Sequence, residues 1–481
     1  MGPGDVPPRL SAQAAGQQGY FGDSNMQLEV IILAAGQGTR MKSKLPKVLH
    51  PLAGRPMLEH VIQAALGLEP TALHVVIGHG FEAVATALAA YPVNWVVQAQ
   101  QLGTGHGVLQ ALPAVAEDST VLVLYGDVPL IGHDTLRSLV TLAAEGPALL
   151  TAEVARPAGY GRILRDDFGA LVAVVEHRDA SAAQRAIHEI NTGLLAAPAR
   201  DLLAYLPRVG NENAQGEYYL PDVLSLAVAE GRAVATCQAD SEMEVLGVND
   251  QQQLNQVERE YQRRQAEALM RAGVALADAG RIDIRGTLRC GVDVRIDVNV
   301  VFEGEVSLGD DVVIGPNCVL RDVTVAAGTT VHAMSHLQEA EIGPGCSVGP
   351  FARLRPGTRL AARARVGNFV ETKNADIGQG SKVNHLTYIG DCDMGPGVNI
   401  GAGTITCNYD GVNKHRTDIG AGVFVGSNST LVAPLRIGDG GFVAAGSTVT
   451  RAVDQDELAV SRARQRNIQG WRRPGKKQAE D

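Results

Sequence analysis

Residues 419–449 read IGAGVF VGSNST LVAPLR IGDGGF VAAGST V, so that an aliphatic residue opens every block of six. The same step recurs in earlier runs that begin at Leu308, Ile342 and Ile377. A short internal period of this kind is typical of a β-solenoid, whereas strands of an ordinary sandwich alternate with period two. We therefore predict that residues 275–455 form an all-β parallel helix whose coils hold three units each, about 18 residues.

The composition narrows the class of protein. A chain of 481 residues is long enough for two or more domains, and 45% apolar but only 4% aromatic residues predict aliphatic cores. The net charge of −10 argues against a nucleic-acid partner. Six cysteines without a CxxC pair and the lack of a membrane-length apolar stretch predict a cytoplasmic protein with no membrane partner. Residues 1–25 lack an apolar signal-peptide core, and we expect a disordered tail there.

The first half has a different pattern. Apolar runs alternate with helical segments over residues 26–250, which predicts an α/β domain with a mostly parallel sheet covered on both faces. Strands are expected at 30–33, 73–77, 94–97 and 121–124, and helices at 57–68 and 81–90. Ligands bind at the carboxyl ends of such strands. The glutamine-rich stretch 251–274 is predicted to be a linker helix, for which we expect no functional role.

Polar loops follow the expected strands. Residues 34–41, AAGQGTRM, form a glycine-rich loop whose amides suit nucleotide oxygens, and Arg40 and Lys47 add cations for phosphates. The loop lacks the full dinucleotide and P-loop signatures, and a simple turn with surface charges fits it as well. Asp127, at the end of the aliphatic run 121–124, suits either Mg²⁺ on a triphosphate or a capping role. The amide-rich segment 98–106 suits a nucleobase edge.

These motifs together resemble the sugar-1-phosphate nucleotidyltransferases in order and spacing: residues 33–41, Pro46-Lys47, Gln98, Gly103-Thr104 and Tyr125-Gly126-Asp127. With the solenoid, residues 26–477 resemble the bifunctional bacterial N-acetylglucosamine-1-phosphate uridyltransferases/glucosamine-1-phosphate acetyltransferases. The strings GEYY at 216–219 and NIGAGTITCNYD at 399–410 add to this resemblance. It implies a Rossmann-like first domain, a left-handed β-helix, a homotrimer, and supply of UDP-N-acetylglucosamine for peptidoglycan and lipopolysaccharide.

The resemblance implies a uridyl-transfer site in the first half. A phosphate oxygen of N-acetylglucosamine 1-phosphate attacks the α-phosphorus of UTP and releases pyrophosphate, and no general base is needed. Mg²⁺, Arg40 and Lys47 would neutralise charge. The implied substrate contacts are Leu33, Ala34, Ala35 and Gly36 for the nucleotide, Gln98, Gly103 and Thr104 for uracil, Tyr125, Gly126 and Asp127 for sugar and metal, and Gly161, Glu176 and Asn191 for N-acetylglucosamine. Asn249 is implied as the second metal ligand beside Asp127.

The second site is expected where the six-residue period breaks, at 406–415, because a polar excursion from a regular prism has no core role. The resemblance makes His385 the base that takes a proton from the glucosamine amine as it attacks acetyl-CoA. Glu371 is a candidate to orient the imidazole. The implied sugar-phosphate ligands are Arg355, Lys373, Tyr388, Asn399, Asn408 and Tyr409, and the implied acetyl-CoA contacts are Ala402, Ser427, Ala445 and Arg462.

Two alternatives remain open from the sequence. The solenoid could be structural or regulatory in a single-function nucleotidyltransferase, as in ADP-glucose pyrophosphorylases, although His385 and the 408–409 loop argue against this. A nucleotide sensor or scaffold with a degenerate site is disfavoured by the intact residues Asp127, Asn249, Arg40 and Lys47. Residues 456–481 are expected to be a C-terminal basic tail, whose basic stretch, residues 472–477, fits solvent exposure and contact with coenzyme A phosphates equally well.

Overall fold

The computed structural model describes residues 27–78 and 80–473. The tail expected at 1–25 and residues 474–477 of the basic tail therefore lie outside the described residues. The chain divides into two compact units, one of Met1–Gln37 with Leu58–Gly247 and one of Gly38–Met57 with Val248–Asp481. The segment Gly38–Met57 thus groups with the second unit although it lies among residues of the first in sequence.

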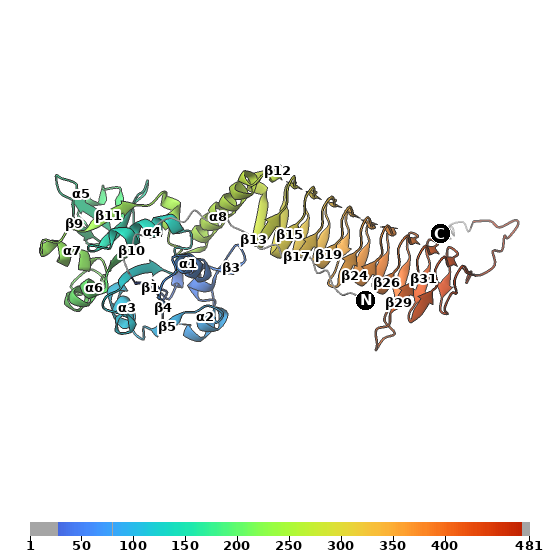
Figure 1. Ribbon diagram of the computed structural model, residues 1–481, viewed down its shortest axis with the longest axis horizontal. Coiled ribbons are helices and arrows are strands. Elements are labelled where there is room, and N and C mark those ends of the chain that lie inside the picture. The colour runs from blue at the N-terminus through green and yellow to red at the C-terminus, as the bar shows by residue number, and fades with distance from the viewer. Residues whose placement is uncertain (1–26, 79, 474–481) are drawn as a thin grey trace, which may run out of the picture. The chain divides into compact units, whose positions relative to one another are not determined.

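The first unit contains a nine-stranded sheet, several strands of which are labelled in Figure 1. Seven strands follow the order β11-β7-β10-β6-β1-β4-β5, and the hairpin of β8 and β9 completes the nine, with β8 pairing with β10. Strand β10 is antiparallel to β6 and β7, whereas β1, β4, β5 and β6 are mutually parallel, which confirms the mostly parallel sheet. The strands are β1 (Leu28–Leu33), β4 (Ala72–Ile77), β5 (Asn94–Val97), β6 (Thr120–Tyr125), β7 (Ala148–Glu153), β8 (Arg162–Arg165), β9 (Leu171–Val175), β10 (Glu189–Pro198) and β11 (Ala235–Gln238).

Both faces of the central strands are buried, as their aliphatic sequences predict. Ile31 of β1 packs in one cluster with Val108 of α3 and Val223 of α7. Its neighbours Val30 and Ile32 point to the opposite face and are also fully buried. The helices are α1 (Met57–Leu66), α2 (Phe81–Ala87), α3 (Thr104–Ala111), α4 (His133–Leu142), α5 (Ala182–Arg185), α6 (Ala199–Tyr205) and α7 (Asp222–Ala229), with 3₁₀ turns at Leu112–Ala114, Leu206–Arg208 and Glu242–Val245.

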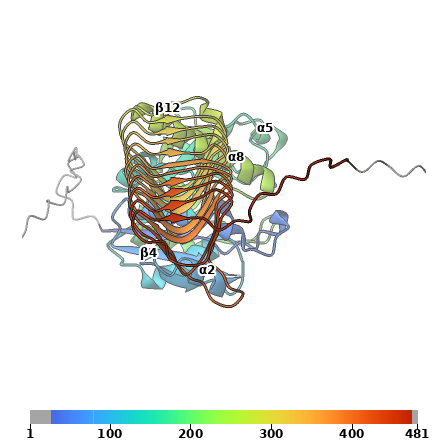
Figure 2. The ribbon, with the colours of Figure 1, turned by 90° about the vertical axis from the view of Figure 1, so that its right-hand side faces the viewer.

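The second unit is a left-handed parallel β-helix preceded by the helix α8 (Gln251–Arg271), and its coils are seen end-on in Figure 2. One eleven-stranded sheet comprises β12 (Ala275–Leu276), β14 (Arg295–Ile296), β16 (Val313–Ile314), β18 (Thr330–Val331), β20 (Ser347–Val348), β23 (Arg365–Asn368), β25 (Lys382–His385), β27 (Asn399–Ile400), β30 (Phe424–Val425), β33 (Phe442–Val443) and β35 (Leu458–Ala459).

The other sheet of this unit has thirteen strands. They are β13 (Ile282–Cys290), β15 (Val300–Leu308), β17 (Val319–Val325), β19 (His336–Ile342), β21 (Arg353–Leu354), β22 (Thr358–Leu360), β24 (Glu371–Ile377), β26 (Tyr388–Met394), β28 (Ile405–Cys407), β29 (Thr417–Ile419), β31 (Thr430–Val432), β32 (Leu435–Ile437) and β34 (Thr448–Val449). The segment Gly38–Met57 adds the 3₁₀ turns Thr39–Met41 and Lys47–Leu49 and the hairpin β2 (Pro51–Leu52) and β3 (Arg55–Pro56), and a further 3₁₀ turn spans Ala279–Arg281.

The six-residue period of the segment 419–449 corresponds to buried positions in the β-helix. All six aliphatic residues that open the blocks between Ile419 and Val449 are buried. Val366 pairs with Val383 and Val383 with Ile400, so each of these coils is close to the expected length. Ile400 then pairs with Val425, a longer step along the chain, because the predicted insertion loops out of that coil. Among the residues described, no helix is long and apolar enough to span a membrane.

Candidate functional sites

The loops after β1, β5 and β6 lie at one edge of the first unit's sheet. The backbone N–H of Gly126 donates to the carbonyl of Leu33 at 2.9 Å, and that of Gln98 donates to Ile77 at 2.8 Å. Gln98 is buried, and its side-chain amide donates to the carbonyl of Gly103 at 3.1 Å and contacts His106 Nδ1 at 3.0 Å. The residues predicted to hold the nucleotide and read uracil are therefore brought together.

The residues predicted to contact the sugar form a polar cluster beside these loops. Burial raises the pKa of Tyr125, while a hydrogen bond with Thr104 opposes the rise. A Cβ on Gly193, which has φ +82°, would stand 2.7 Å from the Tyr125 ring, so glycine is required there. Gly193 was not among the predicted residues. Its position lies two after Asn191, and only the fold shows that it meets Tyr125.

Glu176, Asn191 and Gly161 also come together. The backbone N–H of Asn191 donates to Gly161 at 2.9 Å, and a Cβ on Gly161 would lie 2.9 Å from Glu176 Oε1. Burial raises the pKa of Glu176, a hydrogen bond from Asn191 lowers it, and the carboxylates of Asp222 and Asp179 raise it further. This cluster therefore offers groups that can accept hydrogen bonds from sugar hydroxyls and donate hydrogen bonds to them.

Asp127 follows the carboxyl end of β6 by two residues. Burial is the main cause of the raised pKa of both Tyr125 and Tyr160, and the charge of Asp127 makes a smaller contribution to each. The carboxylate of Asp127 therefore lies near these phenols. No group of three or more acidic, histidine or cysteine side chains arranged for a metal occurs within 27–78 and 80–473. Asp127 belongs to the first unit and Asn249 to the second. That they share one Mg²⁺ stays a prediction.

Arg40, Lys47 and Asn249 meet in the second unit. Asn249 Oδ1 accepts from Arg40 Nη2 at 2.9 Å and from Lys47 Nζ at 3.3 Å. Gly38 has φ +63°, and a Cβ there would lie 2.5 Å from Lys47 Cβ, so the loop turns tightly against the lysine. Two cations predicted for phosphate binding are thus brought to one point with an amide that lies far along the chain.

In the β-helix, the predicted base and the predicted acetyl-CoA contacts lie on one line. His385, Ala402, Ser427 and Ala445 each follow an inward aliphatic residue by two positions, in coils that pair Val383, Ile400, Val425 and Val443 in register. Arg462 donates to the carbonyl of Ala445 at 2.6 Å. We call this line, with Asn368 one coil earlier, the corner column; its members are Asn368, His385, Ala402, Ser427 and Ala445, and Arg462 contacts its last member.

The prediction that Glu371 orients the imidazole of His385 is wrong. His385 Nδ1 lies 3.0 Å from Oδ1 of Asn368, which pairs with it in register. Glu371 instead accepts from Arg355 Nη1 at 2.8 Å. The sequence suggested Glu371 because of its charge, but the pairing of successive coils brings Asn368 to the imidazole.

Lys373 lies beside Arg355 and beside a lysine that the sequence did not suggest. A hydrogen bond and the charge of Lys414 lower the pKa of Lys373, and Arg355 adds to this effect. Asp391 accepts from Asn374 and from Asn408. Burial alone would raise the pKa of Asp391, but these hydrogen bonds and the two lysines lower it overall. The three cations Arg355, Lys373 and Lys414 thus cluster with two carboxylates, those of Asp391 and Glu371, which leaves one positive charge in excess.

The insertion forms a short, ordered excursion. Tyr409 and Lys414 pair across it, and Asp410 accepts from the backbone of Asn413 at 2.7 Å and lies 2.7 Å from His415 Nε2. Val412 at its tip is 84% exposed. Tyr388 lies in register with Glu371 and Ile405, and Asn399 lies on the other sheet between Lys382 and Phe424.

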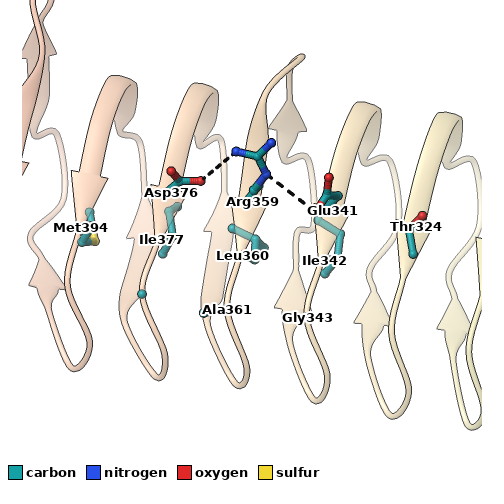
Figure 3. Close-up of a pocket in the computed structure, with 11 residues that line it drawn as sticks. Thr324, Glu341, Ile342, Gly343, Arg359, Leu360, Ala361, Asp376, Ile377 and Met394 are labelled. Atoms are coloured by element: carbon teal, nitrogen blue, oxygen red, sulfur yellow. Dashed lines mark ion pairs between the residues drawn. The ribbon is translucent and has the colours of Figure 1, made fainter. Parts of the chain in front are cut away.

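A hollow of about 610 Å³ on the β-helix is lined by none of the predicted site residues. Its rim carries an ion-pair ladder in which Arg359 lies between Glu341 and Asp376, with closest N–O distances of 3.7 Å on both sides (Figure 3). These three charged side chains, on three successive coils, are therefore paired with one another. Size alone therefore does not identify the chemical site on this unit.

Comparison with known proteins finds relatives that match nearly the whole chain. Proteins named bifunctional protein GlmU are similar: that of Alkalilimnicola ehrlichii is 59% identical over 94% of this chain and 97% of its own, that of Marinobacter nauticus 56% over 93% and 99%, and that of Pseudomonas putida strain GB-1 57% over 94% and 99%. A family model described as a MobA-like NTP transferase domain matches residues 30–203. A solved nucleotidyl transferase from a Methanothermobacter species is 22% identical and covers 50% of this chain and 100% of its own, with TM-score 0.37.

Proposed function

The chain belongs to the family of bifunctional GlmU proteins, and from that premise we propose which of its residues carry each activity. It is an enzyme that makes UDP-N-acetylglucosamine in two steps, acetyl transfer from acetyl-CoA to glucosamine 1-phosphate and uridyl transfer from UTP to N-acetylglucosamine 1-phosphate. The observation that carries the assignment is the corner column, because it aligns His385 with the residues expected to hold the acyl donor.

For uridyl transfer, we propose that the edge formed by 33–36, Gln98 and Thr104 holds UTP, and that Glu176 and Asn191 hold the sugar. The attacking phosphate oxygen is already a nucleophile, so the protein aligns the reactants and neutralises charge. Arg40 and Lys47, which converge on Asn249, would bind triphosphate oxygens and the leaving pyrophosphate.

Mg²⁺ fits the donors present. Magnesium is usually held by one or two protein oxygen ligands and takes the remainder from water and substrate phosphates. Asp127 offers a carboxylate at the end of β6, and Asn249 Oδ1 is proposed as the second oxygen. When bound, the ion would neutralise charge on the triphosphate.

For acetyl transfer, we propose His385 as general base. Asn368 Oδ1 only accepts hydrogen bonds, so His385 Nδ1 carries the proton and Nε2 keeps its lone pair. Nε2 takes a proton from the glucosamine amine as the amine nitrogen attacks the thioester carbonyl. The coenzyme A sulfur then leaves and takes that proton as the amide forms. Arg355, Lys373 and Lys414 would bind the sugar phosphate, whose charge would relieve their mutual repulsion. Tyr388, Asn399, Asn408 and Tyr409 stay predicted contacts.

We propose a homotrimer in which the corner column faces a second copy. Support comes from an exposed apolar ridge, Met334, Phe351, Phe369 and Leu386, which sits one residue beyond the column positions. All four have φ between +48° and +61°, a backbone conformation costly for bulky side chains, and the two phenylalanine rings stack at 5.3 Å. Apolar side chains held there in water suit burial against another subunit.

The direct test supplies glucosamine 1-phosphate, acetyl-CoA, UTP and Mg²⁺ and measures UDP-N-acetylglucosamine. Omission of acetyl-CoA should stop its formation and the release of free thiol. If nucleotide sugar forms from N-acetylglucosamine 1-phosphate while no thiol is ever released, the β-helix serves only structure, as in the single-function alternative.

A further inference from the structure

The hairpin β2–β3 ties the segment Gly38–Met57 to α8 and to the first coil of the β-helix. At its turn, the backbone N–H of Ala53 donates to Glu258 Oε2 on α8 at 2.7 Å. Gly54 has φ +83°, and a Cβ there would lie 3.1 Å from the backbone C and O of Arg285 on β13. Arg55 Nη2 donates to Thr287 Oγ1, also on β13, at 3.0 Å. The turn is therefore held on two sides.

Glu258 is itself fixed. Its Oε1 accepts from Gln262 Nε2 at 2.9 Å, and the buried Gln262 exchanges hydrogen bonds with both the N–H and the carbonyl of Ile284 at 2.8 and 2.9 Å. A buried glutamine paired on both ends with strand backbone is a rigid support, since every polar group has a partner. The chain of contacts from Ala53 through Glu258 and Gln262 thus ends on β13.

The other end of the same segment carries Arg40 and Lys47. The backbone N–H of His50 donates to the carbonyl of Lys47 at 3.2 Å, and that of Met57 donates to His50 at 3.0 Å, so the hairpin closes directly onto the turn that bears the lysine. Lys47 and Arg40 reach Asn249, whose N–H is held by Gln253 of α8 at 2.7 Å. Asn249 lies just before α8, and Glu258 lies seven residues after Gln251, the first residue of that helix, which is roughly 10 Å along it. The segment Gly38–Met57 is therefore held at Asn249 and at Glu258.

We infer that Glu258 and Thr287 are positioning residues for uridyl transfer, which hold Arg40 and Lys47 through the β2–β3 hairpin although they lie in the linker helix and the β-helix. The inference rests on the proposed role of Lys47. It assigns a function to α8, for which the sequence suggested none. Small displacements of groups that bind a transferring phosphate have large effects on rate, because alignment supplies much of the catalysis.

The test uses full-length variants and measures both activities of each. Glu258→Ala should lower kcat for uridyl transfer at least tenfold and leave acetyl transfer unchanged, so acetyl transfer also reports folding of the β-helix. Thr287→Val removes the Arg55 acceptor at nearly constant volume and should lower uridyl transfer more mildly, and it decides the matter if Glu258→Ala does not fold. Glu267→Ala, on the same helix where Glu267 pairs with Arg263, is the matched control and should change neither activity.

A double-mutant cycle separates positioning from general destabilisation. If Glu258 acts through Arg40 and Lys47, Glu258→Ala should cause a smaller fold-loss in a Lys47→Ala background than in the unmodified protein. Independent, multiplicative losses would overturn the inference, and so would unchanged uridyl transfer in both Glu258→Ala and Thr287→Val. Full uridyl transfer by Lys47→Ala alone would instead refute the proposed role of the lysine, and with it the basis of the inference.

Discussion

Asn368 and His385 occupy the same position in successive coils of the β-helix, and their side chains meet at 3.0 Å between Oδ1 and Nδ1. Because Asn368 Oδ1 accepts hydrogen bonds, the contact favours the tautomer protonated at Nδ1 and orients the imidazole. A neutral amide thus takes the place that a carboxylate occupies in many histidine bases.

Removal of this amide should slow acetyl transfer without weakening substrate binding. We expect Asn368→Ala to lower kcat for acetylation about 10- to 100-fold with KM nearly constant, since the imidazole loses its orienting acceptor. Uridyl transfer should not change. Asn317→Ala is the matched control, because Asn317 accepts from Asn299 at 2.9 Å in an earlier coil. Equal effects of the two substitutions would contradict the role of Asn368.

Lys414 should bind the phosphate of glucosamine 1-phosphate together with Lys373 and Arg355. We expect Lys414→Met to raise KM for that substrate about tenfold or more, with a smaller effect on kcat, because it removes one charged contact. The pKa of Lys373, now lowered chiefly by Lys414, should rise toward its ordinary value. Steady-state kinetics tests the first effect. Arg289→Met, which breaks a surface pair with Glu305 in an early coil, should leave KM unchanged; an equal rise in that variant would point to bulk charge.

Glu176 should make the first unit less stable as pH rises. Burial raises the pKa of its carboxyl, so the folded state binds this proton more tightly than the unfolded state. The contribution to unfolding free energy therefore falls as pH increases from about 4.3, the ordinary glutamate value, through the folded pKa, and it stays low above that. Glu176→Gln should remove this dependence, gain stability at neutral pH, and raise KM for N-acetylglucosamine 1-phosphate.

Denaturant unfolding between pH 4 and 8 measures this effect. Trp95 lies on β5 of the first unit, and Trp471 is the other tryptophan of the chain, so a Trp471→Phe background lets fluorescence report the first unit alone. Identical pH dependence with and without Glu176→Gln would show that another group is responsible.

Much of the architecture follows from local pattern in the sequence. The period from Ile419 to Val449 predicts buried positions because each coil repeats the same strand and turn, and the aliphatic run 121–124 predicts a covered strand. The antiparallel direction of β10 was not predicted, because aliphatic residues such as Ile190 and Leu195 suit a parallel and an antiparallel strand equally well. Asn368 and Lys414 were missed for another reason. Their proximity to His385 and Lys373 depends on the length of each coil and on the path of the insertion, which only the pairing of strands reveals.

The claim that two separate sites act in sequence is tested most directly by complementation. Asp127→Asn should lack uridyl transfer and His385→Ala should lack acetyl transfer, while each keeps the other activity. With glucosamine 1-phosphate, acetyl-CoA, UTP and Mg²⁺, neither variant alone should form UDP-N-acetylglucosamine. A mixture of the separately purified variants should form it, because N-acetylglucosamine 1-phosphate made by one can diffuse to the other. A mixture that forms none, although both variants are folded, would contradict the account.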